Sequence, residues 1–330
     1  MVSKILIFRT DKIGDLLITC PIISTLKKEI GKSEITLICS KNNYKYAKTL
    51  SFIDEVLAIP EKNFIKKVSF ILQLSKKYFN YILVLDGKER SLISSIFLKS
   101  KYKIGITQKK YLQLVYKLMG TRIIKDDNKT SLIEIYERVL KHVNLDLKIK
   151  NFDYLQYKKN NNFSSKLLID KYILIHLDEK WIKKLYINKY NDINPSYSDF
   201  LDFIKHVSKN NDIVITTGLV DYNLIEKLKD DFFSKINDKI YIKNNGERKI
   251  YFIYKPTFED LESLLKKANY LISCHGAITH VANSLDVKIL DIIDRSKKDW
   301  YPRFSTYMSD YACIYRADFN LLRNEIIDRI

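Results

Sequence analysis

The chain has 330 residues and a mass of 39.0 kDa, and 46% of its residues are apolar, 29% charged and 12% aromatic. This composition can fill one or two ordinary hydrophobic cores, so it excludes both a disordered chain and a single mini-domain. Eight Gly and five Pro are too few for a collagen-like or Pro-rich linker protein, and no repeat of fixed period is present. We expect a globular protein of one or two domains.

The charge balance is strongly basic, with 57 Lys and Arg against 39 Asp and Glu and a net charge of +18. Such a balance favours an anionic partner, and nucleic acid, an anionic membrane surface and a phosphorylated small molecule all fit. A lysine-rich composition spread over every solvated face is an equally simple interpretation. Because the chain has no Arg-rich block and no aromatic RNA-binding signature, nucleic acid is not the expected partner.

The four cysteines, Cys20, Cys39, Cys274 and Cys313, include no Cys-x-x-Cys pair. This spacing indicates neither a zinc site nor a disulfide framework, and we expect reduced thiols in a cytoplasmic protein. The apolar N-terminal stretch 1–8 is too short for the core of a signal peptide, and no apolar run approaches the roughly 20 residues of a spanning helix. Peripheral contact with an anionic inner membrane remains open.

Short apolar runs alternate with segments of helical period in the first half of the chain. In order, the pattern predicts strand 4–8, helix 16–29, strand 35–39, strand 55–59, helix 64–76, strand 81–86, helix 91–98 and helix 132–142. Repeated βα units of this kind are typical of a doubly wound parallel sheet. The polar run KKNNNFSS at 158–165 then predicts an interdomain linker.

A second series of βα units follows the polar run. The pattern predicts strand 172–176, helix 198–208, strand 213–216, helix 224–233, helix 258–267, strand 270–273, helix 277–285 and strand 288–292. The fold class expected is therefore α/β, with two Rossmann-like doubly wound domains facing a cleft. Their predicted extents are 1–157 for the first domain, 158–168 for the linker, 169–316 for the second domain and 317–330 for a C-terminal helix.

Ligands of open α/β sheets bind beyond the carboxyl ends of the strands. The turn after the first predicted strand holds Arg9, Lys12, Gly14 and Asp15 and leads directly into a helix, whose N-terminus favours negative charge. One interpretation of Asp15 is a helix cap or first-turn carboxylate. The other is a general base that accepts a proton from a hydroxyl nucleophile. The turn is neither a Walker loop nor Gly-x-Gly-x-x-Gly.

Two turns in the second half also carry candidate residues. Lys180 follows strand 172–176, either as a point charge for a diphosphate or as one more exposed lysine. The turn after strand 270–273 has small residues whose backbone N–H groups suit a phosphate, and its histidines lack a third metal ligand nearby. We therefore predict no metal, and the candidate donor-binding set is Lys180, His275, Gly276, Ala277, Ile278, Thr279 and His280, with Thr217 and Gly218 near the site.

Together these turns resemble the bacterial ADP-heptose:lipopolysaccharide heptosyltransferases, glycosyltransferase family 9, which have the GT-B fold. The opening segment KILIFRTDKIGDLLITCPIISTLKK is similar to the family's strand, Arg, loop, Gly-Asp and helix, which implies that Asp15 is the catalytic base. HLDEKW resembles the family's Lys before a Trp and implies a donor-phosphate role for Lys180. DLESLLKKANYLISCHGAITHVANSLDVKILDI is similar to the family's Asp-Ser/Thr-Gly-x-x-His segment, whose His matches His280.

The chain departs from the family pattern at one place, where His275, Gly276 and Ala277 stand for Asp, Ser or Thr, and Gly. In the family that Asp is implicated in holding hydroxyls of the donor sugar, so the sugar stays open. The resemblance implies an inverting, metal-independent glycosyltransferase without a cofactor, which moves a sugar from a nucleotide-diphosphate sugar to a lipopolysaccharide or other glycan. A nucleotide-sugar-binding protein without transfer activity and a basic nucleic-acid-binding protein are the alternatives.

Overall fold

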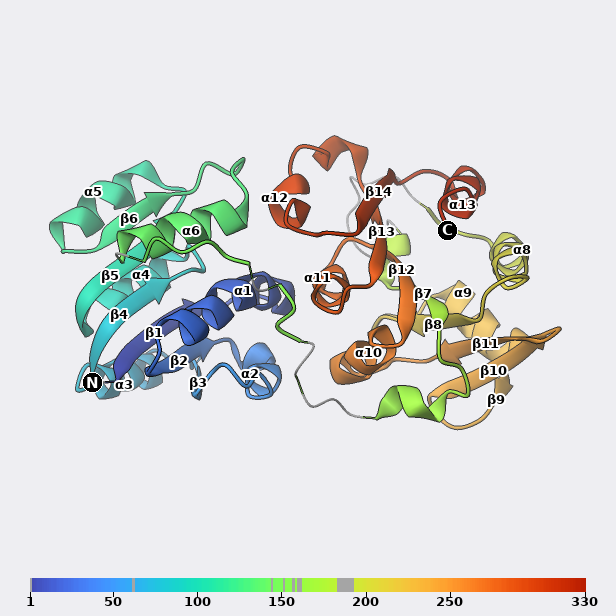
Figure 1. Ribbon diagram of the computed structural model, residues 1–330, viewed down its shortest axis with the longest axis horizontal. Coiled ribbons are helices and arrows are strands. Elements are labelled where there is room, and N and C mark those ends of the chain that lie inside the picture. Colours follow the sequence, from blue (N-terminus) through green and yellow to red (C-terminus); the bar gives the residue numbers. More distant parts are fainter. Residues whose placement is uncertain are drawn as a thin grey trace. The chain divides into compact units, whose positions relative to one another are not determined.

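The structure of the protein is a computed structural model, which describes residues 2–60, 63–143, 145–150, 152–155, 158, 162–182 and 193–330. The chain forms two compact units, each with one sheet (Figure 1). Unit 1 comprises Met1–Lys158 and Pro302–Tyr307, and unit 2 comprises Lys159–Tyr301 and Met308–Ile330. Within the described ranges, no helix combines the length and the apolar character needed to cross a bilayer.

The sheet of unit 1 has six parallel strands in the order β3-β2-β1-β4-β5-β6. Their bounds are β1 Ser3–Arg9, β2 Ser33–Cys39, β3 Glu55–Ala58, β4 Tyr78–Val84, β5 Lys99–Thr107 and β6 Arg122–Lys125. The chain moves outward in one direction from β1 to β3 and then returns to β4 on the other side of β1. The carboxyl ends of β1 and β4 therefore form the topological switch point, where ligands bind in sheets of this type.

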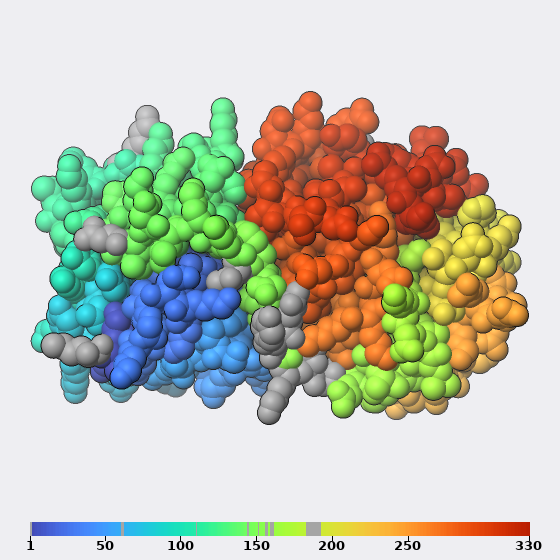
Figure 2. All heavy atoms as spheres, in the orientation of Figure 1, coloured from blue at the N-terminus to red at the C-terminus, as the bar shows by residue number. Residues whose placement is uncertain are grey.

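Helices cover both faces of this sheet. They are α1 Ile13–Glu29, α2 Lys41–Ala47, α3 Phe64–Leu74, α4 Glu89–Ile96, α5 Lys110–Leu118 and α6 Leu132–His142. Leu74 on α3, Leu92 on α4 and Leu112 on α5 share one hydrophobic core with Leu6 and Phe8 of β1, so these three helices cover one face. On the other face α1 contacts α2 and α6, and Figure 2 shows α1 and α6, in blue and green, as a continuous surface.

A short segment near the C-terminus belongs to unit 1, although the sequence places it in the second domain. This segment carries α12, Pro302–Ser305. Arg303 donates two hydrogen bonds of 2.6 Å to the two carboxylate oxygens of Asp126, and both side chains are buried. Tyr307 stacks on Phe152 with ring centroids 4.9 Å apart. The predicted range 169–316 is therefore corrected, because a buried ion pair and an aromatic stack fix 302–307 on unit 1.

The Arg303–Asp126 pair gives a stability prediction. Burial alone would raise the pKa of Asp126, but hydrogen bonds from Arg303 and the Asn128 N–H hold this pKa below its ordinary value. Arg303→Lys keeps the charge and loses the two-pronged geometry, so we expect it to lower the free energy of unfolding by about 1.5–3 kcal/mol. The difference from wild type should shrink as pH falls from about 4, the ordinary pKa of this carboxyl in the unfolded chain, through its lower pKa in the folded protein. Urea unfolding at two pH values measures both effects, and equal stabilities at neutral pH contradict the prediction.

The sheet of unit 2 has eight strands in the order β14-β13-β12-β7-β8-β11-β10-β9. The first six are parallel, and β10 and β9 are antiparallel to their neighbours. The strands are β7 Tyr172–Leu177, β8 Ile213–Thr217, β9 Ser234–Lys235, β10 Ile240–Asn245, β11 Arg248–Ile253, β12 Ala268–Cys274, β13 Lys288–Ile293 and β14 Tyr311–Tyr315.

Helices also cover the sheet of unit 2. They are α8 Tyr197–Val207, α9 Asn223–Lys227 with a π-helical turn Leu228–Phe232, α10 Phe258–Leu265, α11 Ala277–Ser284 and α13 Phe319–Ile327, with short 3-10 turns η1 Phe163–Lys166, η2 Glu179–Trp181 and η4 Arg295–Lys297. Phe200 and Phe203 on α8 pack against Phe319 on α13 and belong to the core that contains Trp181. Helices α10 and α11 contact each other.

The expected fold class is confirmed, since each unit is built on a doubly wound, largely parallel sheet (Figure 1). The described part of the predicted linker is not an open connection. Phe163 and Ser164 are buried, and the Ser164 N–H donates to the Ser263 hydroxyl on α10 at 3.0 Å. Residues 159–161 of that linker lie outside the described residues. The apolar Phe163 and Leu167 within the predicted linker explain why 162–168 packs onto unit 2.

Candidate functional site

Three turns meet at the carboxyl edge of the unit 2 sheet. Strand β7 lies between β12 and β8, and His176 of β7 pairs with Ser273 on one side and Thr216 on the other. Because parallel neighbours end at the same edge, the turns that follow these strands lie side by side. They contain Lys180, Gly218 and the segment 275–280, so the structure brings together the unit 2 residues that the sequence singles out.

Lys180 is held in place by the short turn after β7. The Asp178 carboxylate accepts the Lys180 backbone N–H at 3.0 Å and pairs with the Lys180 ammonium at 2.7 Å. Trp181 anchors this turn, because its side chain is fully buried and its indole N–H donates to the His176 carbonyl at 2.8 Å. Only 17% of the Lys180 side chain is exposed. Lys180 is thus a positioned cation and not one more solvated surface lysine.

Glycine allows the three turns to approach one another. A Cβ atom at Gly276 would lie 2.5 Å from the Lys180 Nζ, which is too close for any real contact. A Cβ at Gly218 would lie 3.0 Å from the Asp178 Cβ, and the Gly218 N–H donates to the Leu177 carbonyl at 2.8 Å. The Lys180 ammonium can therefore sit against the turn after β12 only because residue 276 has no side chain.

Helix α11 begins directly after Gly276, beside the Lys180 ammonium. The N-cap residue is Gly276 itself, which has no side chain to cap the helix. The Thr279 N–H and hydroxyl both turn back to the Gly276 carbonyl, at 3.1 and 2.6 Å. The first backbone N–H groups of a helix have no intrahelical acceptor, and together with the helix dipole they attract anions. The N–H groups around Ala277 and Ile278 and the Lys180 ammonium therefore form a candidate phosphate site.

His275 is paired with a buried carboxylate. Its Nδ1 lies 2.5 Å from the Oδ2 of Asp291 on β13, and the Tyr311 hydroxyl donates to the same oxygen at 2.9 Å. Asp291 is fully buried, whereas 11% of the His275 side chain is exposed. When Nδ1–H donates to Asp291, a neutral imidazole presents Nε2 as a hydrogen-bond acceptor. In that tautomer, the Nε2 atom of His275 can accept a hydrogen bond from a hydroxyl group.

His280 lies deeper than His275. It is buried, and its ring stands edge-on to the His275 ring with centroids 5.8 Å apart. Burial, with a smaller contribution from His275, lowers the pKa of His280 to about 3. His280 is therefore neutral at physiological pH and supplies a hydrogen-bonding ring but no positive charge. Thr217 is buried as well, and its hydroxyl accepts the Lys255 N–H at 2.8 Å.

Asp15 lies at the carboxyl edge of the unit 1 sheet, in the first turn of α1. Its Oδ2 accepts the Lys12 N–H at 3.3 Å, and its Oδ1 lies 3.5 Å from a guanidinium nitrogen of Arg9. The carboxylate therefore caps the helix, as one interpretation of the sequence predicts, yet 38% of the side chain remains exposed. Lys12 is exposed and Gly14 is half-buried in the same turn.

Arg9 links this turn to the neighbouring strand β4. It is buried, donates to the Leu85 carbonyl at 2.5 Å, and donates through Nε to the Asp15 carbonyl at 2.9 Å. Burial alone would lower the pKa of Arg9, but Tyr136 and the nearby carboxylates raise it above its ordinary value. Arg9 is thus a permanent buried cation that fixes the backbone beneath the Asp15 carboxylate.

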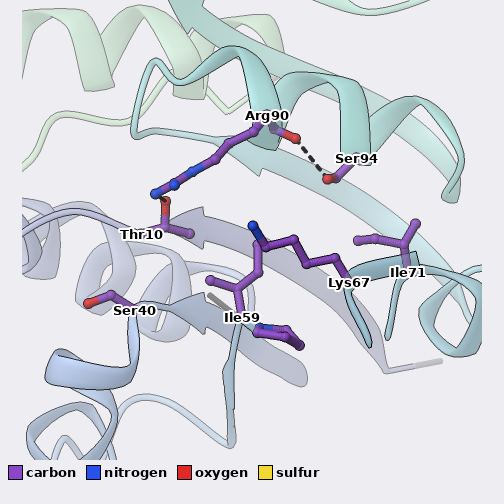
Figure 3. A pocket seen from close by; sticks show the side chains of 8 residues that line it. Thr10, Ser40, Ile59, Lys67, Ile71, Arg90 and Ser94 are labelled. Carbon is purple, nitrogen blue, oxygen red and sulfur yellow. Dashed lines mark hydrogen bonds between the residues drawn. The ribbon is translucent and has the colours of Figure 1, made fainter. Parts of the chain in front are cut away.

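A pocket of about 240 Å³ opens at the same edge of unit 1. Figure 3 shows Arg90 reaching from α4 toward Thr10, and Lys67 of α3 lies on the other side of the pocket. The Arg90 guanidinium donates to the Thr10 hydroxyl at 3.3 Å. Ile59 and Ile71 supply apolar walls. Two cations and an apolar wall suit a small polar ligand with an anionic group.

The sequence analysis did not single out several residues of these sites. Asp86 accepts hydrogen bonds from the Thr10 and Ser91 hydroxyls at 2.7 and 2.6 Å, and burial raises its pKa. The acidic residue at the end of predicted strand 81–86, followed by a cationic turn, was the available signal. For Asp291 the signal was a lone carboxylate inside the apolar run KILDII, since a buried acid needs a partner.

No protein-family model matches the sequence, and no curated protein matches it. Solved structures do match along the whole chain. E. coli heptosyltransferase WaaC with ADP-2-deoxy-2-fluoro heptose has 14% identity, a TM-score of 0.67, and coverage of 99% of this chain and 100% of that one. The chain has the fold of the heptosyltransferases. The glycosyl transferase family 9 protein from Veillonella parvula has 15% identity and a TM-score of 0.67, over 99% of this chain and 90% of that one.

The same fold also occurs in a different class of enzyme. The UDP-GlcNAc 2-epimerase from Methanocaldococcus jannaschii has 13% identity and a TM-score of 0.59, over 99% of this chain and 92% of that one. The resemblance predicted from the three turns is thus confirmed at the level of the two-unit GT-B fold. At such identities the likeness concerns the fold, and function has to be argued from the site.

Proposed function

We propose that the protein is an inverting glycosyltransferase, which moves a sugar from a nucleotide-diphosphate sugar to a glycan or glycolipid such as lipopolysaccharide. The observation that carries the proposal is the Lys180 ammonium, which is held by Asp178 against Gly276 at the start of α11. A positioned cation beside the first N–H groups of a helix is an arrangement that binds a diphosphate. The heptosyltransferase WaaC, whose fold the chain shares, was solved with ADP.

The donor site would also stabilise the leaving group. As the bond between the anomeric carbon and the diphosphate breaks, negative charge develops on the diphosphate oxygens. Fixed hydrogen-bond donors aimed at that charge lower the barrier, because they need no reorganisation during the reaction. Lys180 and the N–H groups of 276–278 would fill this role, so the proposed reaction uses no divalent metal and no cofactor.

The His275–Asp291 pair bears on the donor sugar. The resembled family has an Asp at the position of His275, where it is implicated in holding sugar hydroxyls. A neutral imidazole whose Nδ1–H donates to Asp291 has Nε2 as its hydrogen-bond acceptor. In that form, His275 can accept a hydrogen bond from a sugar hydroxyl, as the Asp of the family would. We propose that His275 in place of Asp preserves the binding of a sugar hydroxyl but changes which hydroxyl of the donor sugar is bound. The imidazole ring places its acceptor atom farther from the backbone than a carboxylate does.

Unit 1 would supply the acceptor site and the base. The pocket lined by Lys67 and Arg90 would hold an anionic part of the acceptor. The exposed Asp15 carboxylate would take the proton from the acceptor hydroxyl as its oxygen attacks the anomeric carbon. The new C–O bond forms as the bond to the diphosphate breaks, so the configuration at the anomeric carbon inverts.

A thermal-shift panel of ADP, GDP, UDP, CDP and CMP tests the proposal. A nucleotide at 100 times its dissociation constant should stabilise the protein by about 2.7 kcal/mol. One diphosphate that raises the melting temperature supports the donor site and selects the sugar nucleotides for a transfer assay. Hydrolysis or epimerisation of a UDP-sugar without acceptor would favour an epimerase, and binding without turnover would favour a non-catalytic protein. A shift with random nucleic acid alone rejects the proposal.

A further inference from the structure

Exposed apolar side chains are concentrated on one layer of unit 1. Of the twenty large apolar side chains that are exposed in the described chain, eleven lie on α3, α4, α5 or the residues that end them. Among these eleven, Leu118, Phe64 and Ile65 are the most exposed, at 81%, 78% and 77%, and Leu114 is also exposed. Such a concentration of exposed apolar side chains is typical of an interaction site.

These side chains face the same direction. The inner sides of α3, α4 and α5 pack into the core on one face of the sheet through Leu74, Leu92, Leu112 and Tyr116. The exposed apolar residues of the same helices therefore lie on the outer side of this helical layer. We call this surface the α3–α5 face.

The same stretch of chain carries most of the net positive charge. Residues 63–125 contain fourteen Lys and Arg and two acidic residues, Asp86 and Glu89. Asp86 is turned toward Thr10 and Ser91, and Glu89 pairs with Lys109 and accepts a hydrogen bond from the Tyr111 hydroxyl at 2.8 Å. The three helices themselves hold five cations against the single acid Glu89, namely Lys66, Lys67, Arg90, Lys110 and Lys117. Exposed apolar side chains and an excess of cations therefore belong to the same three helices.

We propose that the α3–α5 face docks on the surface of an anionic lipid bilayer. A bilayer interface accepts apolar side chains into its acyl boundary, and its anionic headgroups attract Lys and Arg nearby, so it matches both features of the face. A protein partner would need acidic residues interleaved with apolar ones, whereas a bilayer presents both components everywhere. The net charge of the chain predicts an anionic partner, and the structure locates the contact.

Docking by this face would leave unit 1 with its pocket at the membrane surface. Lys67 of α3 and Arg90 of α4 both line that pocket and both belong to the helices of the α3–α5 face. A lipid-anchored ligand would then meet the pocket without leaving the bilayer. The docking itself does not depend on the proposed glycosyl transfer, because it involves neither Asp15 nor any residue of unit 2.

Flotation of the full chain with vesicles tests the inference, in the absence of donor and acceptor. The chain should float with vesicles of phosphatidylcholine mixed with phosphatidylglycerol at low salt, and should stay behind with phosphatidylcholine alone. Replacing Lys66, Lys76 and Lys117 with Gln should reduce partitioning about five-fold per residue. Replacing Ile65, Leu114 and Leu118 with Ser should reduce it about tenfold per residue.

Matched substitutions on unit 2 control for general charge and stickiness. The charge control replaces three exposed lysines of unit 2 with Gln: Lys171, Lys209 and Lys288. The apolar control replaces three exposed apolar residues of unit 2 with Ser: Leu168, Ile236 and Leu321. The controls should float like wild type, and all variants should keep the wild-type melting temperature. Equal losses in the controls, or no flotation of wild type, overturn the inference. The inference is also overturned if the wild type does not bind vesicles but forms a dimer in solution that the Ser variant of the α3–α5 face dissociates. That result would assign the face to a second copy of the chain.

Discussion

Replacing Asp15 with Asn should lower the turnover number for sugar transfer by about 10²–10⁴-fold, the usual contribution of a positioned general base. The affinity for the donor nucleotide should stay unchanged, because the candidate phosphate site is built entirely from unit 2. Asn keeps an oxygen that can accept the Lys12 N–H, so the helix cap survives and only the proton acceptor is lost. Release of the nucleotide diphosphate, followed with the donor that the thermal-shift panel identifies, measures the effect.

The matched control for this variant is Asp11→Asn. Asp11 stands in the same turn, 3.8 Å from the Arg9 guanidinium and 3.0 Å from the Lys88 ammonium, so its loss removes the same charge from the same surroundings. Asp11→Asn should retain most of the turnover. If Asp15→Asn also keeps wild-type turnover, the carboxylate serves as a helix cap alone and the base must be sought elsewhere.

The regular βα units of the fold could be predicted because each buried strand is an apolar run followed by a helical period. The segments 99–127 and 239–254 carried no such prediction, although they form β5, α5, β6 and the β10–β11 hairpin. Their strands contain many Lys residues, and at its start β5 alternates Lys with Ser100 and Tyr102 instead of showing an apolar run. The hairpin turn needs the positive φ of 62° at Gly246, which the Asn-Gly pair before Glu247 could have indicated.

The positions of the candidate sites could be predicted from the sequence because they lie at the ends of strands, and the ends of buried strands could be located. The turns after β1, β7 and β12 could be located from the sequence, and the residues predicted for unit 2 do meet. The sequence could not predict which side chains from different parts of the chain contact each other. The contact of His275, in the turn after β12, with Asp291 on β13 joins residues sixteen positions apart, and Arg303 reaches Asp126 across 177 positions. Such partners depend on strand order, which local periodicity does not encode.

Removing the Lys180 ammonium should weaken the binding of nucleoside diphosphates. Hydrogen bonds to charged groups contribute about 1.5–3 kcal/mol, so Lys180→Met should raise the dissociation constant of the responding nucleotide about 10–150-fold. The affinity for the corresponding nucleoside, which lacks phosphates, should not change. Titration calorimetry with both ligands separates a lost phosphate contact from a general loss of the site. Lys267→Met is the matched control, because Lys267 precedes β12 at the opposite edge of the sheet and pairs with Asp170.

Gly276→Ala tests the same contact from the other side. Its Cβ would lie 2.5 Å from the Lys180 Nζ, so the ammonium must move while the charge is kept, and we expect a smaller loss of diphosphate affinity than in Lys180→Met. If both changes act through the position of this ammonium, their effects should not add, and the double variant should bind no more weakly than Lys180→Met alone. Additive losses would mean that the Ala methyl group blocks the ligand directly. A Lys180→Met variant that binds the diphosphate as tightly as wild type would remove Lys180 from the donor site.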